Sequence, residues 1–281
     1  MQSPDISPHR PILPIIYILG NSHSGSTLFA LLMSAHPDII NLGEFKAPTW
    51  TRDRKCTCGR EIPECPFYHD FFARYNEVRK RIFESIKPGS SLELVFKSAK
   101  KNNLESIKEL STFYTELSQR VFDHYPLARY ITDSSKSLWM LNAWLQALPQ
   151  EDVKIIWIRR HLKPNVASFV KRGHSFLSSL VALITNEKLN RKYLLSNKLP
   201  FVEVDYSRFY DDYDAELKNV SDFIGLSVPT QYTDHRNHHV ISGNRQTLNQ
   251  FTTNFHGLQK DDQWESILSK TQKRILSWLE K

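Results

Sequence analysis

Short apolar runs rich in β-branched residues alternate along the chain with longer segments in which apolar positions recur at helical spacing. The apolar runs predict β-strands at residues 14–20, 128–133, 153–160 and 199–206. A segment with a helical pattern follows each of them, at residues 26–37, 135–148, 165–172 and 216–226. Strands that alternate with helices in this way predict an α/β fold, in which a central parallel sheet is flanked by helices on both faces.

Helices are also predicted outside these strand and helix pairs. Residues 70–86 and 92–125 are rich in Glu, Lys and Leu, and a Pro-Gly pair at 88–89 separates them. We expect this region, about 70–125, to be a helical cap or insertion, with a lid over the substrate as the more specific alternative. Residues 263–279 predict a closing helix. Because no repeat or shift in composition marks a boundary, we expect a single domain over 1–281 with a flexible polar tail at 1–12.

An excess of positive charge narrows the class of partner. The formal net charge is +7 and the sequence pI is about 9.2, which favours anionic ligands. The lysines and arginines are dispersed and form no basic block, so nucleic acid is not an expected partner. No apolar run approaches the roughly 20 residues of a membrane span, and we therefore expect a cytoplasmic protein that does not enter a membrane. The sequence gives no indication of the oligomeric state.

The three cysteines of the chain, Cys56, Cys58 and Cys65, all lie within one short segment. Their odd number in a chain of this length disfavours a disulfide scaffold. Together with His69 they offer three sulfurs and one nitrogen, which is a donor set for zinc, although the spacing matches no common zinc module. The alternative is a tight loop with free thiols. Both interpretations stay open, and the sequence alone assigns no metal ligand.

The segment GNSHSGST, residues 20–27, has the pattern of a phosphate-binding loop that lacks the usual lysine. Gly20, Gly25, Ser26 and Thr27 keep the glycines and hydroxyls of the pattern, and the helix that follows directs its positive end at a bound anion. In nucleoside triphosphatases the lysine contacts the β- and γ-phosphates. A loop without it suits a donor with no triphosphate, such as a sulfuryl donor, whose transferred group carries one negative charge fewer.

The longer segment GNSHSGSTLFALLMSAHPDIINLGE, residues 20–44, resembles the sulfotransferases that use 3′-phosphoadenosine 5′-phosphosulfate. It is most similar to the tyrosylprotein type and its bacterial relatives. The resemblance implies that Glu44 is the general base that deprotonates the acceptor. His23 stands where the family has an arginine. The resemblance also implies that the loop binds the 5′-phosphosulfate through Asn21, Ser22, His23, Ser24, Gly25, Ser26 and Thr27.

Three later segments extend the resemblance along the chain. PFVEVDYSRFYDDYDAELKNVSDFIGLSVP, residues 200–229, looks like the family's strand, acidic turn and helix. IIWIRRHLKPNVASF, residues 155–169, is similar to the family's 3′-phosphate segment, which implies Arg160 and Ser168 as ligands, with Arg159 as the alternative arginine. A guanidinium at a strand end and a hydroxyl in the first turn of a helix would bind one phosphate from two sides. HHVISGNRQTL, residues 238–248, resembles the family's loop that closes over the nucleotide and implicates Gly243, Asn244 and Arg245.

A lysine in the segment TDSSKSLW is the candidate for stabilising the leaving group. Lys136 resembles the lysine that the family brings to the bridging oxygen, and with His23 it would stabilise the departing oxygen. A lysine without function is disfavoured there, because a positive charge in a first helical turn opposes the helix dipole. Asp133, at the end of the same strand, has a second interpretation as the magnesium-binding aspartate of a kinase or triphosphatase.

These features together predict a sulfotransferase that uses 3′-phosphoadenosine 5′-phosphosulfate and leaves adenosine 3′,5′-bisphosphate. We expect the acceptor to be a hydroxyl or amine of a small molecule, and the transfer to require no metal. The sequence shows no leader or membrane anchor, which favours a natural product over an exported acceptor. A magnesium-dependent kinase or triphosphatase is the main alternative, and a noncatalytic nucleotide-binding protein is another.

Overall fold

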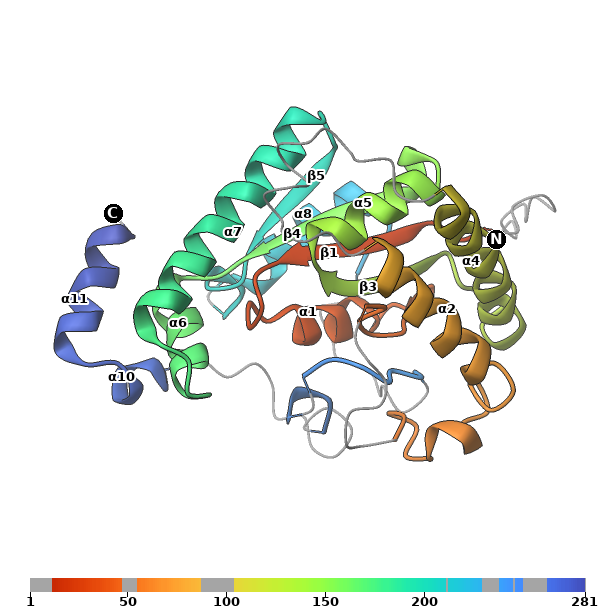
Figure 1. Ribbon diagram of the computed structural model, residues 1–281, viewed down its shortest axis with the longest axis horizontal. Helices are drawn as coiled ribbons and strands as arrows, with labels where there is room; N and C mark the ends of the chain where they lie inside the picture. Colours follow the sequence, from red (N-terminus) through yellow and green to blue (C-terminus); the bar gives the residue numbers. More distant parts are fainter. Residues whose placement is uncertain are drawn as a thin grey trace.

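A five-stranded, entirely parallel sheet forms the centre of the protein in the computed structural model (Figure 1). The order of the strands is β2-β3-β1-β4-β5. The structure describes residues 12–46, 55–86, 104–210, 212–228, 238–244, 246–249 and 262–280. The strands are β1 (Ile15–Gly20), β2 (Ile39–Asn41), β3 (Tyr130–Lys136), β4 (Val153–Arg159) and β5 (Phe201–Asp205).

The α/β architecture predicted from the sequence is confirmed. Each of the four predicted strands is present, as β1, β3, β4 and β5. The edge strand β2 was not predicted, because its three residues are too few to show a periodic pattern.

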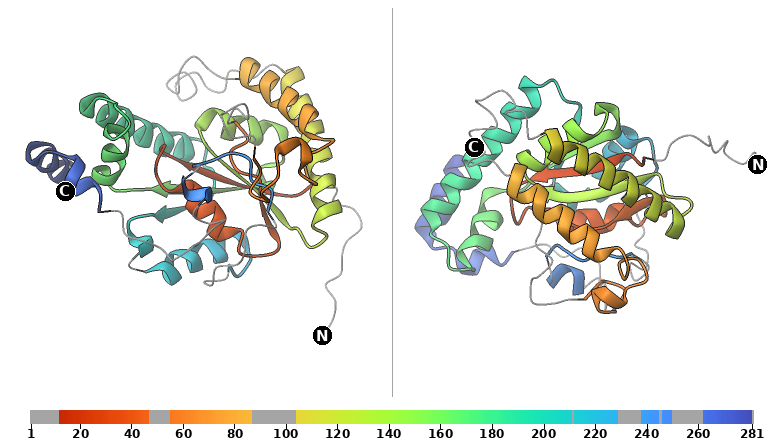
Figure 2. Two further views of the ribbon diagram at one scale, coloured as in Figure 1. Left: turned by 90° about the horizontal axis from the view of Figure 1, so that it is seen from below. Right: turned by 45° about the vertical axis from the view of Figure 1, so that its right-hand side comes forward.

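Helices cover both faces of the sheet, as Figure 2 shows. Alternate side chains of β1 explain the two layers: Tyr17 belongs to one apolar cluster, while Ile16 and Ile18 belong to another. The first cluster packs against α2 (Phe72–Ile86), α4 (Leu104–His124), α5 (Leu138–Ala147) and α7 (Phe176–Ser196). The second cluster packs against α1 (Ser26–Met33) and α8 (Tyr213–Ile224).

Further helices form a smaller layer beside α7. α6 (Leu162–Val170), α10 (Trp264–Ile267) and α11 (Lys270–Leu279) enclose a third apolar cluster with α7. Residues 263–279 were predicted as one helix, but Ser269 begins a new one, with a capping box to Gln272. The structure also has short 3₁₀ helices, η1 (Ile62–Glu64), η2 (Gln150–Asp152) and η3 (Arg208–Tyr210), and a helical turn at residues 246–249.

Two helices differ from the prediction in extent or existence. α6 begins at Leu162, earlier than residue 165, because Pro164 is tolerated in a first turn and Glu280 accepts the backbone N–H of Leu162 at 2.7 Å. α7 was not predicted at all. Its apolar residues do not lie on one face, since Leu177 and Val181 are exposed while Leu183 is buried, and the helical period is therefore hidden.

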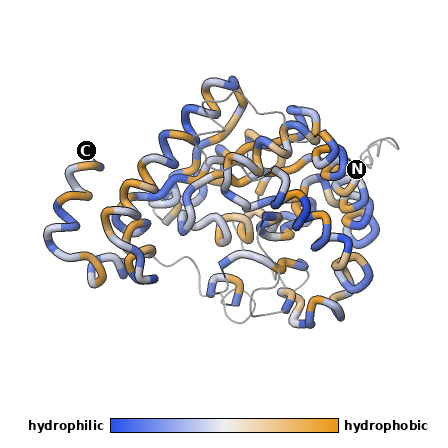
Figure 3. The backbone as a smooth tube through the Cα atoms, viewed as in Figure 1, coloured by the Kyte–Doolittle hydropathy of each residue, from blue (hydrophilic) through white to orange (hydrophobic). Residues whose placement is uncertain are grey.

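The region predicted as a helical cap or insertion contains α2 and α4. Their buried residues, among them Tyr75, Phe113 and Tyr114, pack into the same cluster as Tyr17 of the sheet. Figure 3 shows that the central strands are hydrophobic along most of their length, while hydrophobic and hydrophilic residues alternate along the outer helices. Among the helices that the structure describes, none has the length and apolar character needed to cross a membrane.

Candidate active site

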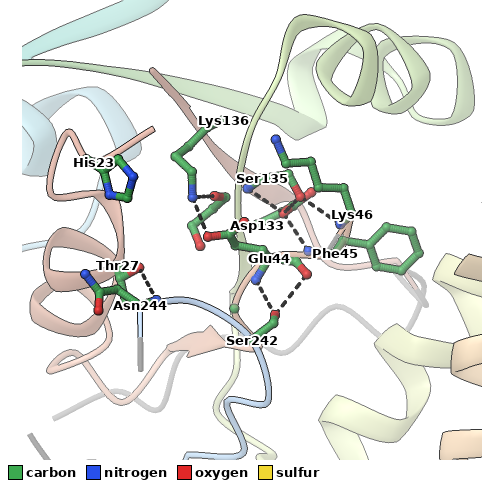
Figure 4. Close-up of polar contacts among 12 residues, drawn as sticks. His23, Thr27, Glu44, Phe45, Lys46, Asp133, Ser135, Lys136, Ser242 and Asn244 are labelled. Atoms are coloured by element: carbon green, nitrogen blue, oxygen red, sulfur yellow. Dashed lines mark hydrogen bonds and ion pairs between the residues drawn. The ribbon is translucent and has the colours of Figure 1, made fainter. Parts of the chain in front are cut away.

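The candidate residues gather at the carboxyl edge of the parallel sheet. All five strands run in one direction, so the segments that follow them meet at a single edge. The phosphate loop follows β1, Glu44 follows β2, and Lys136 ends β3. Figure 4 shows Glu44 and Lys136 in contact, with His23 facing them from the loop and Asn244 lying beside Thr27.

The phosphate loop turns into α1 at Gly25, which has a φ of 90°. A Cβ atom there would lie 2.1 Å from the ring of Tyr206, so only glycine fits both the backbone and the space. The N-terminus of α1 has no side-chain cap and no acidic residue in its first turn. Among the described residues, the fully buried Ser24 hydroxyl has no hydrogen-bond partner. These unpaired groups suit a bound anion.

The C-terminal segment lies directly on this loop. The backbone N–H of Asn244 donates to the Thr27 hydroxyl at 3.1 Å, and a Cβ on Gly243 would lie 3.1 Å from the Thr27 side chain. The structure thus brings Gly243 and Asn244 to the predicted nucleotide site, while Arg245 lies outside the described residues.

Two loop residues predicted as ligands have other surroundings. The Asn21 side chain turns toward α7, where its amide donates to the carbonyl oxygen of Leu183 at 3.4 Å and its oxygen accepts from Asn186 at 2.6 Å. The side chain of Ser22 is exposed. The roles of Asn21 and Ser22 as ligands of the phosphosulfate stay predictions.

The main chain of Glu44 is fixed from two sides. Gly43 precedes it with a φ of 90°, and a Cβ there would lie 2.3 Å from the carbonyl oxygen of Ser242. The Glu44 N–H donates to the Ser242 hydroxyl at 2.7 Å, and that hydroxyl donates to the Glu44 carbonyl at 2.9 Å. The glycine of the Gly-Glu pair therefore allows the C-terminal segment to approach the candidate base closely.

Lys136 is the last residue of β3, where the pairing with β1 shifts. Tyr17 pairs with Asp133 and Leu19 with Lys136, so β3 has one extra residue, a bulge that redirects the side chain. Lys136 has a φ of 66°, its side chain is mostly buried, and its ammonium group donates to the Glu44 carboxylate. The predicted place in a first helical turn is wrong, because Ser137 is the N-cap of α5.

Asp133 holds the segment around Glu44 in place. One carboxylate oxygen accepts from the Phe45 amide at 3.0 Å and from the amide and hydroxyl of Ser135 at 2.9 and 2.5 Å. The other accepts from the indole of Trp144 at 2.8 Å. Burial raises the pKa of Asp133, while the bonds from Ser135 and Trp144 lower it. With both oxygens engaged by protein donors, this carboxylate is not positioned to bind magnesium.

The side chains of Arg159 and Arg160, at the end of β4, point in different directions. Arg159 forms ion pairs with Glu187 and Glu203, each at 2.5 Å. Arg160 instead donates to the carbonyl of His23 at 2.6 Å, and its guanidinium lies 5.4 Å from the ring centre of Tyr206. Of the two arginines, Arg160 is the one that contacts the phosphate loop.

His23 lies among cations. Burial lowers its pKa to about 4, with further contributions from Arg172, Lys136 and Arg160. An Arg172 nitrogen lies 3.2 Å from the His23 Nε2, and the backbone φ of His23 is 63°. The imidazole is therefore neutral near pH 7, and the positive charge around it is carried by Arg172, Lys136 and Arg160.

Ser168 lies in the second turn of α6, since that helix begins at Leu162. The prediction that its hydroxyl sits in the first turn is wrong. Its side chain is half-buried, and its role as a phosphate ligand stays a prediction.

Three contacts of this site were missed in the sequence. Ser242 anchors Glu44, Tyr206 covers Gly25, and Arg172 contacts His23. Ser242 is adjacent to the Gly-Asn pair that was noted, so the motif gave a signal. Tyr206 lies in the segment 200–229 that resembles the family, but nothing in that segment indicated a contact with Gly25. Arg172 lies beyond the 3′-phosphate segment, and only the fold brings both residues to the loop.

Comparison with known proteins gives one family and several structures. Residues 14–230 match a protein family described as "Sulfotransferase family". The sulfotransferase domain from the curacin biosynthetic pathway is similar with a TM-score of 0.57 and 15% identity, covering 96% of this chain and 98% of that one. The sulfotransferase domain from the Synechococcus PCC 7002 olefin synthase gives a TM-score of 0.47 and 17% identity over 100% and 99% of the two chains. No curated protein sequence matches the chain.

Proposed function

Because the chain belongs to the sulfotransferase family, we propose that it uses 3′-phosphoadenosine 5′-phosphosulfate as donor and sulfates a hydroxyl or amine of a small molecule. The donor, when bound, supplies the sulfuryl group and a phosphate leaving group. The proposal rests on how the residues at the carboxyl edge of the sheet suit this anion and its acceptor.

The observation that carries the proposal is the concentration of positive charge around a phosphate loop that has no lysine of its own. Burial lowers the pKa of His23, and the nearby charges of Arg172, Lys136 and Arg160 lower it further, which indicates an electropositive site. The buried Ser24 hydroxyl and the uncapped N-terminus of α1 add donors in the same place. A phosphosulfate would satisfy both the donors and the charges.

Glu44 and Lys136 have different roles at the reacting centre: one accepts a proton and the other stabilises the leaving group. Glu44 takes the proton from the acceptor hydroxyl or amine as the new bond to sulfur forms. As the bond between sulfur and the bridging oxygen breaks, the electron pair stays on the 5′-phosphate, which Lys136 stabilises. In the structure these two side chains form an ion pair. The phosphosulfate offers the ammonium group a competing anion, so donor binding frees the Glu44 carboxylate for the acceptor.

The 3′-phosphate is the second anion that the site must recognise. Arg160 lies on the loop side of β4 and is our candidate for this contact, with Ser168 from the following helix. His23 contributes as a hydrogen-bond donor near the bridging oxygen. Gly243 and Asn244 lie against the loop and would line the nucleotide from the C-terminal side.

A natural product is our proposed acceptor class. The similar structure with a TM-score of 0.57 is a sulfotransferase domain from the curacin biosynthetic pathway. At 15% identity that domain shares the fold, and its context motivates the acceptor screen rather than fixing its result. We expect transfer without a metal, since Asp133, the residue that a magnesium-dependent kinase would need, has its carboxylate engaged by main-chain, hydroxyl and indole donors.

Calorimetric titration tests the donor. Adenosine 3′,5′-bisphosphate and ATP are each titrated with magnesium and with a chelator. We expect tight binding of the bisphosphate in both conditions and weak binding of ATP. Magnesium-dependent binding of ATP in preference to the bisphosphate would refute the proposal and favour phosphoryl transfer.

Two variants assign the residues. Arg160→Ala should weaken binding of the 3′-phosphorylated nucleotide by at least about tenfold while changing the affinity for its 3′-dephosphorylated analogue little. Arg159→Ala is the matched control, because its guanidinium is paired with Glu187 and Glu203.

Glu44→Gln should abolish transfer and leave nucleotide affinity within about threefold. Activity of the glutamine variant near the wild-type level would place the base elsewhere.

A further inference from the structure

Four potential metal ligands meet in a cluster outside the candidate active site. Within the described residues, the side-chain donor atoms of Cys56, Cys58, Cys65 and His239 all lie within 4.8 Å of one another. The Cys58 and Cys65 sulfurs are 3.8 Å apart, and the His239 Nδ1 lies 3.1 Å from the sulfur of Cys65 and 3.5 Å from that of Cys56. Three of the four residues are buried, and all three cysteines are free.

The distances fit one tetrahedral zinc ion. With Zn–S near 2.3 Å and Zn–N near 2.0 Å, a tetrahedral site places two sulfurs about 3.8 Å apart and a sulfur and a nitrogen about 3.5 Å apart. The Cys58–Cys65 separation of 3.8 Å and the Cys56–His239 separation of 3.5 Å match these values, and the Cys65–His239 separation of 3.1 Å is shorter. Three sulfurs and one imidazole also make a closed donor set, which is typical of structural zinc and leaves no coordination position for catalysis.

His69, the nitrogen donor that was considered from the sequence, is not the histidine beside the three cysteines. His69 is exposed, with its Nδ1 3.3 Å from Asp70, and it lies outside the cluster. His239 comes instead from the C-terminal segment, and its ring stacks on Phe67 at 5.5 Å between centroids. The spacing matches no common zinc module because the last ligand is contributed by a distant part of the chain.

The cluster joins the cysteine loop to the wall of the active site. The Thr57 hydroxyl donates to the His238 carbonyl at 2.6 Å and accepts from the Val240 amide at 3.0 Å. Ser242, which anchors Glu44, and Asn244, which contacts Thr27, follow on the same segment. A metal here would therefore hold the segment that positions the candidate base.

We propose that Cys56, Cys58, Cys65 and His239 bind one structural Zn²⁺, which fastens residues 238–244 to the catalytic centre. This site is separate from the proposed sulfuryl transfer and does not depend on it.

Metal analysis of the full chain tests the proposal. The protein is purified without chelator or added metal, and zinc is measured by mass spectrometry. We expect about one zinc per chain in the wild type and in His69→Ala, and at least about tenfold less in His239→Ala. Equal zinc content in the two histidine variants, or stoichiometric iron in place of zinc, would overturn the proposal.

A second measurement on the wild type covers the case in which His239→Ala does not fold. Treatment with a strong chelator should release the zinc, raise the rate at which a thiol reagent modifies the cysteines by at least about tenfold, and lower the melting temperature. Adding Zn²⁺ should reverse these changes. Purification of the wild type without metal, with a Cys58–Cys65 disulfide or with three rapidly reacting thiols, would refute the site whatever the transferase activity.

Discussion

The buried carboxylate of Asp133 allows a prediction of both sign and size. In Asp133→Asn, the oxygen that accepts from Phe45 and Ser135 can keep all three of its bonds. The new amide nitrogen then faces the indole N–H of Trp144, which lies 2.8 Å from the present oxygen. The amide N–H of the variant and the indole N–H of Trp144 are both donors, so this hydrogen bond is lost. Turning the amide by 180° is worse, because its nitrogen would then face the three donors of Phe45 and Ser135.

The cost follows from these contacts. Losing a hydrogen bond to a charged group costs about 1.5–3 kcal/mol, and leaving a buried donor unpaired adds about 1–3 kcal/mol. Part of this is offset because the ionised carboxylate, whose pKa burial raises, is no longer held in the interior. We expect Asp133→Asn to lower the free energy of unfolding by about 3 kcal/mol, which is roughly a hundredfold in the folding equilibrium.

Urea unfolding followed by tryptophan fluorescence measures this change. Asp222→Asn is the control, since its ion pair with Lys218 is exposed and should be worth less than about 0.5 kcal/mol. Trp144→Phe removes the opposing donor, so it should cost at least about 1 kcal/mol less in the Asp133→Asn background than in the wild type. A loss below about 1 kcal/mol for Asp133→Asn, or strict additivity of the two substitutions, would refute the reasoning.

Three further predictions concern the geometry and charge of the active site. Ser242→Ala removes both hydrogen bonds to the Glu44 main chain, so kcat should fall at least about tenfold while nucleotide affinity measured by calorimetry stays the same; an unchanged kcat would contradict this. Gly25→Ala should abolish nucleotide binding because a tyrosine ring fills the space, whereas Gly225→Ala, with a φ of 71° but open surroundings, should only lower stability, by about 1–2 kcal/mol. Burial and nearby cations lower the pKa of His23 to about 4, and a bound anion should raise it, so bisphosphate binding should take up protons from about pH 4 up to the raised pKa; equal uptake in His23→Gln, from calorimetry in buffers of different ionisation enthalpy, would show that another group titrates.

Much of the sheet could be predicted from the sequence, because its strands are apolar runs bounded by turn residues. The phosphate loop could be placed for the same reason, since its glycines and hydroxyls are consecutive. α7 could not, because its apolar residues lie on several sides of the helix, and β2 is too short to carry a pattern. Lys136 was found by its motif, yet its actual setting at a strand bulge depends on pairing with β1, which no local pattern encodes.

The C-terminal segment 238–244 shows most clearly why part of the site was hidden. It contains no helix or strand, so its own hydrogen bonds do not fix it, and ordering each residue costs about 1–2 kcal/mol of conformational free energy. Its position comes from partners far away in the sequence: Ser242 bonds to Glu44, 198 residues earlier, and Asn244 to Thr27, 217 residues earlier. A few neutral hydrogen bonds of about 1 kcal/mol each, together with the burial of Val240 and Ile241, offset part of that ordering cost. A metal ligated by His239 and the three cysteines would add to these contributions, and it would explain why those cysteines lie opposite this segment rather than elsewhere in the fold.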